Sequence, residues 1–219
     1  MTPRAVAAEA LGTGLLVTAV VGSAIMAGNL TQDGGVLLLA NAIATGAALL
    51  VLITVFAPIS GAQFNPAVSL ILALRRQITW PACAAFVLAQ CAGGIAGTLL
   101  AHAMFDLPLW QTSTHIRSGA AQYLAEGVAT FGLILTILGG QNAKGTNVAM
   151  LVASYITAAY WFTASTSFAN PVMALARSLT DTPAGIRPAD APAFVLAELA
   201  GAVLAMALGG WLFRAPDQV

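Results

Sequence analysis

The chain has 219 residues, of which 59% are hydrophobic and only 7% are charged. Soluble domains carry about 25% charged residues, so a compact soluble protein of this composition would expose apolar surface almost everywhere. The mean hydropathy of +0.87 indicates instead a chain whose solvent is largely lipid. Eight basic and eight acidic residues cancel, so no overall charge favours binding to nucleic acid.

Six apolar stretches are each close to the 20 or so residues that a helix needs to cross about 30 Å of hydrocarbon. Strands are not expected, because the apolar residues are continuous rather than alternating. Small residues recur in the stretches, which lets membrane helices approach closely. The expected fold class is therefore an all-α membrane bundle. Its predicted spans are Val6–Met26, Val36–Ala57, Ala82–Met104, Tyr123–Gly140, Val148–Ser165 and Ala193–Phe213.

The two halves of the chain resemble each other. The first and fourth spans each carry an Ala-Glu pair, at Glu9 and Glu126, followed four residues later by Thr. The third and sixth spans match more strongly, Phe86–Gly93 against Phe194–Gly201. Each half holds three spans, an odd number, so the second half must enter the bilayer from the opposite side. The sequence therefore predicts an inverted repeat, an arrangement that places sites near the middle of the membrane.

We expect one domain over residues 1–219, with internal repeats at approximately 1–110 and 119–219. The basic residues favour an orientation with both termini in the cytoplasm, since cytoplasmic loops are enriched in Lys and Arg. In that orientation five basic residues lie inside, Arg4, Arg75, Arg76, Lys144 and Arg214, and three lie outside, Arg117, Arg177 and Arg187.

Two Asn-Pro pairs, Asn65-Pro66 and Asn170-Pro171, lie at equivalent places in the two halves, each before a short apolar piece. Asn is a preferred N-cap and Pro is tolerated at the first helical position. Ten helical residues rise only about 15 Å, half the hydrocarbon thickness. A single pair would be an ordinary helix cap, but the equivalent placement predicts two half-helices that meet at mid-membrane. Irregular backbone at that depth needs a polar cavity, so a water-filled path is expected.

The electrostatics of that meeting point predict which solutes pass. Each helix N-terminus contributes about half a positive charge in a low-dielectric setting, so two of them repel cations, including hydronium. The amides of Asn65 and Asn170 can donate hydrogen bonds to a passing oxygen and replace part of its hydration. Neutral hydroxylated molecules are favoured over ions.

The two boxes, the string Ser60–Val68 and the pair Glu9 and Glu126 resemble the aquaporin/aquaglyceroporin (major intrinsic protein) family, in a bacterial branch with Asn-Pro-Ala and Asn-Pro-Val boxes. The resemblance covers essentially the whole chain. It implies six tilted helices plus two half-helices, a homotetramer in the bacterial inner membrane, and one pore per protomer for small neutral solutes. It also implies that Glu9 and Glu126 accept hydrogen bonds from loop amides. The pore motif that it assigns is Asn65, Pro66, Ala67, Asn170, Pro171 and Val172.

The chain departs from the family pattern at the second box. Val172 replaces the usual Ala, and Gln63 stands where many members have His. Most members have Arg three residues after the second Asn, but this position is Met173. Arg177 follows one helical turn later, and either reaches back toward the pore mouth or anchors the external loop.

The resemblance also maps a selectivity filter onto this chain. Its positions fall on Thr45, on Thr157 or Ala158, on a loop carbonyl of Thr166 or a neighbour, and on Met173. None of these has a bulky ring, so we expect a filter that is wider and less polar than one specific for water. Polyols, and neutral metalloid hydroxides such as arsenous acid, become candidate solutes. Tyr160 and Trp161 are expected to anchor the helix at the membrane interface.

Two other kinds of membrane protein are compatible with this pattern. Inverted repeats with broken helices also build secondary transporters, although both boxes offer neutral amides rather than titratable groups. A structural membrane protein with a closed pore is the other alternative. No nucleophile–base pair, phosphate loop or metal-ligand spacing is present, so neither an enzyme nor a cofactor or metal site is expected.

Overall fold

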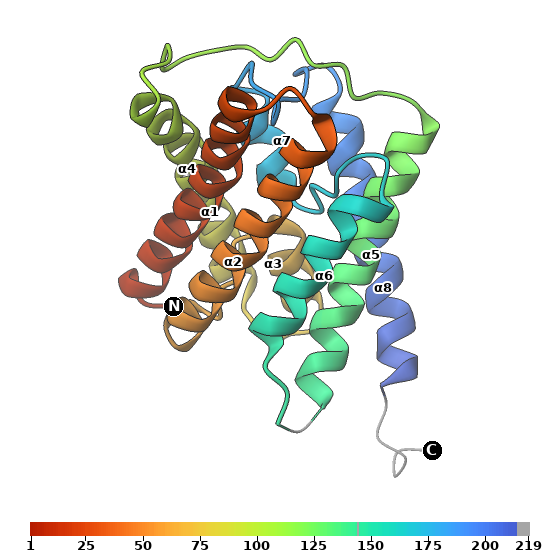
Figure 1. The fold of residues 1–219 in the computed structure, drawn as a ribbon. Coiled ribbons are helices and arrows are strands. Elements are labelled where there is room, and N and C mark those ends of the chain that lie inside the picture. The colour runs from red at the N-terminus through yellow and green to blue at the C-terminus, as the bar shows by residue number, and fades with distance from the viewer. Residues whose placement is uncertain (144, 214–219) are drawn as a thin grey trace.

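The computed structural model describes residues 1–143 and 145–213, and within them the chain forms eight helices and no strand. Two short helices, α3 (Pro66–Leu74) and α7 (Pro171–Arg177), lie inside a bundle of longer ones, α3 in its lower half and α7 in its upper half in Figure 1. The surrounding helices are α1 (Pro3–Leu30), α2 (Gly34–Ser60), α4 (Trp80–Met104), α5 (Ala120–Asn142), α6 (Val148–Phe162) and α8 (Ala191–Leu212). The predicted all-α membrane fold, six spans plus two half-helices, is confirmed.

Five of the described helices are long and apolar enough to cross a membrane, and most begin or end a few residues beyond the predicted limits. The exception is α6, which has 15 residues and a rise of only about 22 Å. It ends at Phe162 rather than at the predicted Ser165, because the backbone turns extended at Thr163. Left-handed φ angles at Thr166 and Ser167 then prevent the helix from continuing.

Glycines make the closest contacts between long helices, at equivalent places in the two halves. A Cβ on Gly93 of α4 would lie 2.1 Å from the carbonyl oxygen of Ala10 in α1. A Cβ on Gly201 of α8 would lie 2.1 Å from the carbonyl oxygen of Gly127 in α5. Only glycine fits at such distances, so the backbones of α1 and α4, and of α5 and α8, touch directly.

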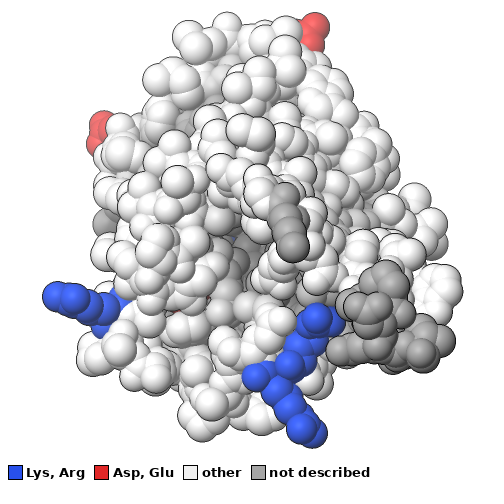
Figure 2. Space-filling model, turned by 90° about the horizontal axis from the view of Figure 1, so that it is seen from below, with Lys and Arg blue, Asp and Glu red and all other residues white. Residues whose placement is uncertain are grey.

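Helix α1 begins and α8 ends at the same end of the molecule, the lower end in Figure 1. The outer segment, which we define as residues 105–119, crosses the opposite end and joins α4 to α5. Figure 2 views the lower end and shows basic side chains, all of them Arg, at two places on its margin, with a hollow near the centre. Of the five basic residues predicted at this end, Lys144 and Arg214 lie outside the described residues.

Candidate pore

The two half-helices meet at their N-termini. Asn65 caps α3 by accepting a hydrogen bond from the amide of Ala67 (2.9 Å), and Asn170 caps α7 by accepting one from the amide of Val172 (3.0 Å). Each Asn also donates across the junction, because Nδ2 of Asn65 binds the carbonyl of Ala169 (2.7 Å) and Nδ2 of Asn170 binds the carbonyl of Phe64 (2.8 Å). The two hydrogen bonds that hold the boxes together therefore join residues that are 104 and 106 positions apart in the sequence.

The backbone before each Asn has the same unusual shape. The residues three and one before Asn65, Ala62 and Phe64, have φ angles of 49° and 50°. Their counterparts before Asn170, Ser167 and Ala169, have φ angles of 52° and 48°. Left-handed geometry costs a non-glycine residue about 1–2 kcal/mol, so it persists only where the surroundings fix it.

Buried glutamates supply that fixation. Glu9, on α1, accepts hydrogen bonds from the amides of Gln63 (2.9 Å) and Phe64 (2.7 Å) and from the side chains of Ser60 and Gln90. Both carboxylate oxygens of Glu9 are thereby occupied.

The second half uses the same device. Glu126, on α5, accepts from the amides of Phe168 (2.9 Å) and Ala169 (2.8 Å). Glu198, on α8 at the position equivalent to Gln90, accepts from the amide of Asn170 (3.1 Å). Glu9, Glu126 and Glu198 are fully buried, and each binds backbone that would otherwise present unpaired N–H groups inside the membrane.

A cavity of about 130 Å³ runs beside the junction of the half-helices. It extends from Gln141 and Val148, near one end of the bundle, to Thr45 and Arg177 on the other side of the boxes. Asn65 and Asn170 both line it, and each amide has a second N–H besides the one that crosses the junction. A water needs about 10–15 Å³ of such space, so the cavity holds a short file of water-sized molecules.

The walls of this cavity are mainly apolar, with polar groups at few places. Aliphatic side chains of the long helices form much of the lining, and they are Leu16, Val20, Leu49, Ile53, Leu133, Ile137, Val148, Val152 and Ile156. Polar groups at the boxes and at the outer end provide the hydrogen bonds, as in sites where a few placed polar groups determine specificity.

Of the predicted filter residues, Thr45 and Met173 line the cavity, but Thr157, Ala158 and Thr166 do not. On α6, the residue that lines the cavity beside Thr45 is Tyr160, whose hydroxyl lies 3.0 Å from Oγ1 of Thr45. The structure therefore places neither Thr157 nor Ala158 at the cavity. Three residues of α6 spaced four apart, Val152, Ile156 and Tyr160, face the cavity together, as helical periodicity requires.

The two rejected positions face other surroundings. The hydroxyl of Thr157 donates a hydrogen bond to the carbonyl of Ala153 (2.8 Å). It also packs directly against Gly46 of α2, so closely that a Cβ at Gly46 would clash with it. Ala158 is exposed on the outside of the bundle. In the loop, Ser167 and Phe168 line the cavity in place of Thr166.

The sequence placed no bulky ring at the expected filter positions, whereas the cavity has two aromatic residues in its lining. The aromatic residues Tyr160 and Phe168 are both among the residues that line the cavity, and Tyr160 is 3% exposed rather than placed at the membrane interface. The repeat of apolar residues every four positions along α6 was the available signal for Tyr160. Phe168 had no such signal, because its ring direction depends on the left-handed backbone around it.

Arg177 fulfils both of the alternatives that the sequence left open. Its side chain lines the cavity, with Cζ 3.5 Å from the centroid of the Phe168 ring. Its Nε also donates a hydrogen bond to the carbonyl of Ala184 in the loop between α7 and α8. The guanidinium is thus held over an aromatic face, a favourable arrangement for a cation, at the outer end of the cavity.

Comparison with known proteins identifies the family. The family model described as major intrinsic protein matches residues 1–181. The chain belongs to this family. As a major intrinsic protein it is a multi-pass membrane channel for small neutral solutes, not an enzyme.

One relative of known name covers nearly the whole chain, and others cover part of it. The chain is 62% identical to aquaglyceroporin AqpS of Rhizobium meliloti (strain 1021) over 214 residues, which cover 98% of this chain and 91% of that protein. It is 33% identical to probable aquaporin PIP2-8 of Oryza sativa subsp. japonica over 148 residues, 64% of this chain and 53% of that protein. The X-ray structure of the aquaglyceroporin from Plasmodium falciparum superposes with a TM-score of 0.74 over 97% of this chain and 96% of that one. At 19% identity, this last match shows the shared fold.

Proposed function

We propose that this protein is a passive channel for water and for glycerol-sized neutral solutes, with one pore per chain. One observation carries the proposal, namely that two half-helix N-termini, each tipped by an Asn amide, meet at the wall of a continuous cavity. The halves 1–110 and 119–219 would then form a single channel domain. The relative from Rhizobium meliloti is named as an aquaglyceroporin, which supports glycerol as a solute.

The charges around the cavity favour a channel over a secondary transporter. A transporter couples solute movement to ions through titratable or ion-coordinating groups near the midplane. Here the groups that line the cavity at the boxes are the neutral amides of Asn65 and Asn170. The buried carboxylates of Glu9, Glu126 and Glu198 bind loop amides and are not among the lining residues of the described chain.

The outer end of the cavity is proposed as the selectivity filter. Thr45, Tyr160, Phe168, Met173 and Arg177 surround it. A guanidinium with two helix N-termini behind it repels cations, and the hydroxyls of Thr45 and Tyr160 can exchange hydrogen bonds with a solute. Neutral metalloid hydroxides such as arsenous acid carry the same kind of hydroxyl groups as polyols, and we include them among the solutes.

We further propose a homotetramer in the bacterial inner membrane with both termini in the cytoplasm. Apolar side chains are exposed along the outside of the long helices, among them Leu88, Leu124 and Leu196, as expected for surfaces against lipid or neighbouring protomers. The end where α1 begins carries Arg4, Arg75 and Arg76, which supports its placement on the cytoplasmic side.

The test is a flux panel in proteoliposomes that measures water, glycerol and arsenous acid by stopped-flow light scattering and uptake. A channel gives rates above those of empty vesicles that rise linearly with solute concentration and need no ion gradient. Saturation at low concentration, or dependence on an ion gradient, would identify a transporter. Rates equal to those of empty vesicles for all three solutes would identify a closed pore.

A further inference from the structure

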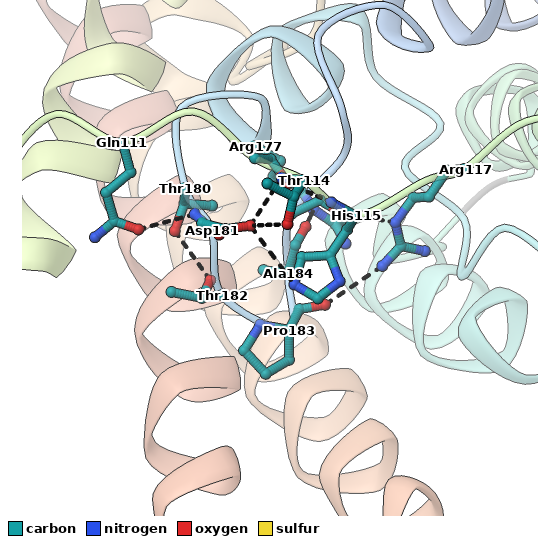
Figure 3. Close-up of polar contacts among 12 residues, drawn as sticks. Gln111, Thr114, His115, Arg117, Arg177, Thr180, Asp181, Thr182, Pro183 and Ala184 are labelled. Atoms are coloured by element: carbon teal, nitrogen blue, oxygen red, sulfur yellow. Dashed lines mark hydrogen bonds and ion pairs between the residues drawn. The ribbon is translucent and has the colours of Figure 1, made fainter.

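Arg117 of the outer segment reaches across the protein to the loops around α7. Its Nε donates to the carbonyl of Gly185 (2.7 Å), one terminal nitrogen donates to that of Ser165 (3.3 Å), and the other donates to that of Pro183 (3.4 Å). Figure 3 shows the side chain pointing from the outer segment toward Pro183. Ser165 precedes α7, and the other two residues follow it. One guanidinium therefore joins both sides of the half-helix.

Arg117 shares its targets with the pore-lining Arg177. The carbonyls of three consecutive residues, Pro183, Ala184 and Gly185, accept from these two arginines, the middle one from Arg177 and the flanking ones from Arg117. Both guanidiniums also lie over the ring of Phe168, Arg177 at 3.5 Å and Arg117 at 5.2 Å from the centroid. The positions of the Phe168 ring and the Arg177 guanidinium are thereby coupled to Arg117, and both of these residues line the cavity.

The outer segment that carries Arg117 is itself attached at several points. The amide of Arg117 donates to the carboxylate of Asp190 (2.9 Å), and the amide and hydroxyl of Thr114 donate to Asp181 (2.8 and 2.9 Å; Figure 3). The hydrogen bonds from Thr114 lower the pKa of Asp181. This carboxylate stays ionised above about pH 4 and loses its contribution only as the pH falls further. The arginine is therefore held on a fixed support at physiological pH.

Within the described chain, neither guanidinium forms an ion pair with a carboxylate within 4.0 Å, since the two such contacts involve His115 and Arg187. The hydrogen-bond acceptors for both guanidiniums are backbone carbonyl oxygens instead. A planar fork of donors matches several fixed carbonyls in a way that a lysine ammonium does not, so the geometry of Arg117, and not only its charge, holds the loops.

We propose that Arg117 is a positioning residue for the outer filter, which fixes Phe168 and Arg177 at the cavity and so determines the size of solute that passes. The inference rests on the proposed channel function. Without the fork, the loop before α7 and the turn at 183–185 lose their common anchor. The ring and the guanidinium then gain freedom to move away from the cavity, and larger solutes are admitted.

The test compares glycerol and water permeability in proteoliposomes containing equal amounts of wild type, Arg117→Met, Arg117→Lys and Arg4→Met. We expect the glycerol-to-water ratio to rise about threefold or more in Arg117→Met, and to rise in Arg117→Lys as well, because lysine keeps the charge and loses the fork. Arg4→Met is the control, since this arginine is exposed at the opposite end of the molecule and does not line the cavity.

A merely structural role lowers the flux of both solutes together and leaves the ratio unchanged. An unchanged or lower ratio in Arg117→Met, or a wild-type ratio in Arg117→Lys, overturns the positioning role. If Arg117→Met does not fold, the ratio in Arg117→Lys decides alone. Failure of the proposed function is distinguished by the wild-type vesicles, which would then conduct no faster than empty ones.

Discussion

The replacement of Asn170 by Asp tests the amide-tipped junction directly. The side-chain Nδ2 of Asn170 donates to the carbonyl of Phe64 (2.8 Å), while its Oδ1 accepts from the amide of Val172 (3.0 Å). Asp keeps the second bond, because Asp and Asn are equivalent N-caps, so α7 still begins at Pro171. The first bond is lost, and a carboxylate oxygen then faces a carbonyl oxygen.

The magnitude follows from the lost donors. A hydrogen bond contributes about 0.5–1.5 kcal/mol net. A solute that accepts a hydrogen bond from the second N–H of Asn170 loses this bond in the Asp variant, so the barrier to its passage rises by this amount. The flux of water and glycerol is expected to fall about 2- to 12-fold. The carboxylate also offsets the positive potential of the two helix N-termini, so the exclusion of cations is expected to weaken at the same time.

Stopped-flow swelling of proteoliposomes with equal protein content measures the effect, with Asn147→Asp as the matched control. Asn147 also caps a helix, α6, by accepting from the amide of Met150 (3.2 Å), but it is exposed and does not line the cavity. If Asn170→Asp conducts water and glycerol as fast as Asn147→Asp does, the amides are not the solute donors and the reasoning about the junction fails.

Two further substitutions test the filter and the packing. Met173→Arg places a second guanidinium beside Arg177 in the cavity, so glycerol flux should fall several-fold more than water flux in the same vesicles; equal losses would contradict the proposed filter. Gly201→Ala forces α8 away from the carbonyl of Gly127, where a Cβ would lie at 2.1 Å, and overpacking costs about 1–3 kcal/mol. Its thermal midpoint in detergent should fall, whereas Gly127→Ala, with its nearest contact at 3.6 Å, should melt near or above wild type. Equal midpoints for the two variants would show that the helices are not in direct contact at this point.

The sequence alone determined the membrane class, the helix order and the meeting of the two boxes. These depend on local properties, since a run of about 20 apolar residues can only cross a bilayer and an Asn-Pro pair before a short apolar piece can only begin a short helix. The duplication added the relation between the halves, because an odd number of spans inverts the second half. Hydrogen bonds between Asn65 and Ala169, and between Asn170 and Phe64, join the places that this reasoning predicted.

The tertiary structure alone decided which side chains face the cavity at its outer end. A shift of one residue along α6 turns a side chain by about 100°. Because the length of the following loop was uncertain, the sequence pointed to Thr157 or Ala158, whereas Tyr160 is the residue that lies at the cavity. Arg117 is 48 to 68 residues from the carbonyls that it binds, and no periodicity or local pattern encodes such a contact. The filter was beyond sequence reasoning because its parts come from separate helices and loops, whose relative positions are fixed only when the whole bundle packs.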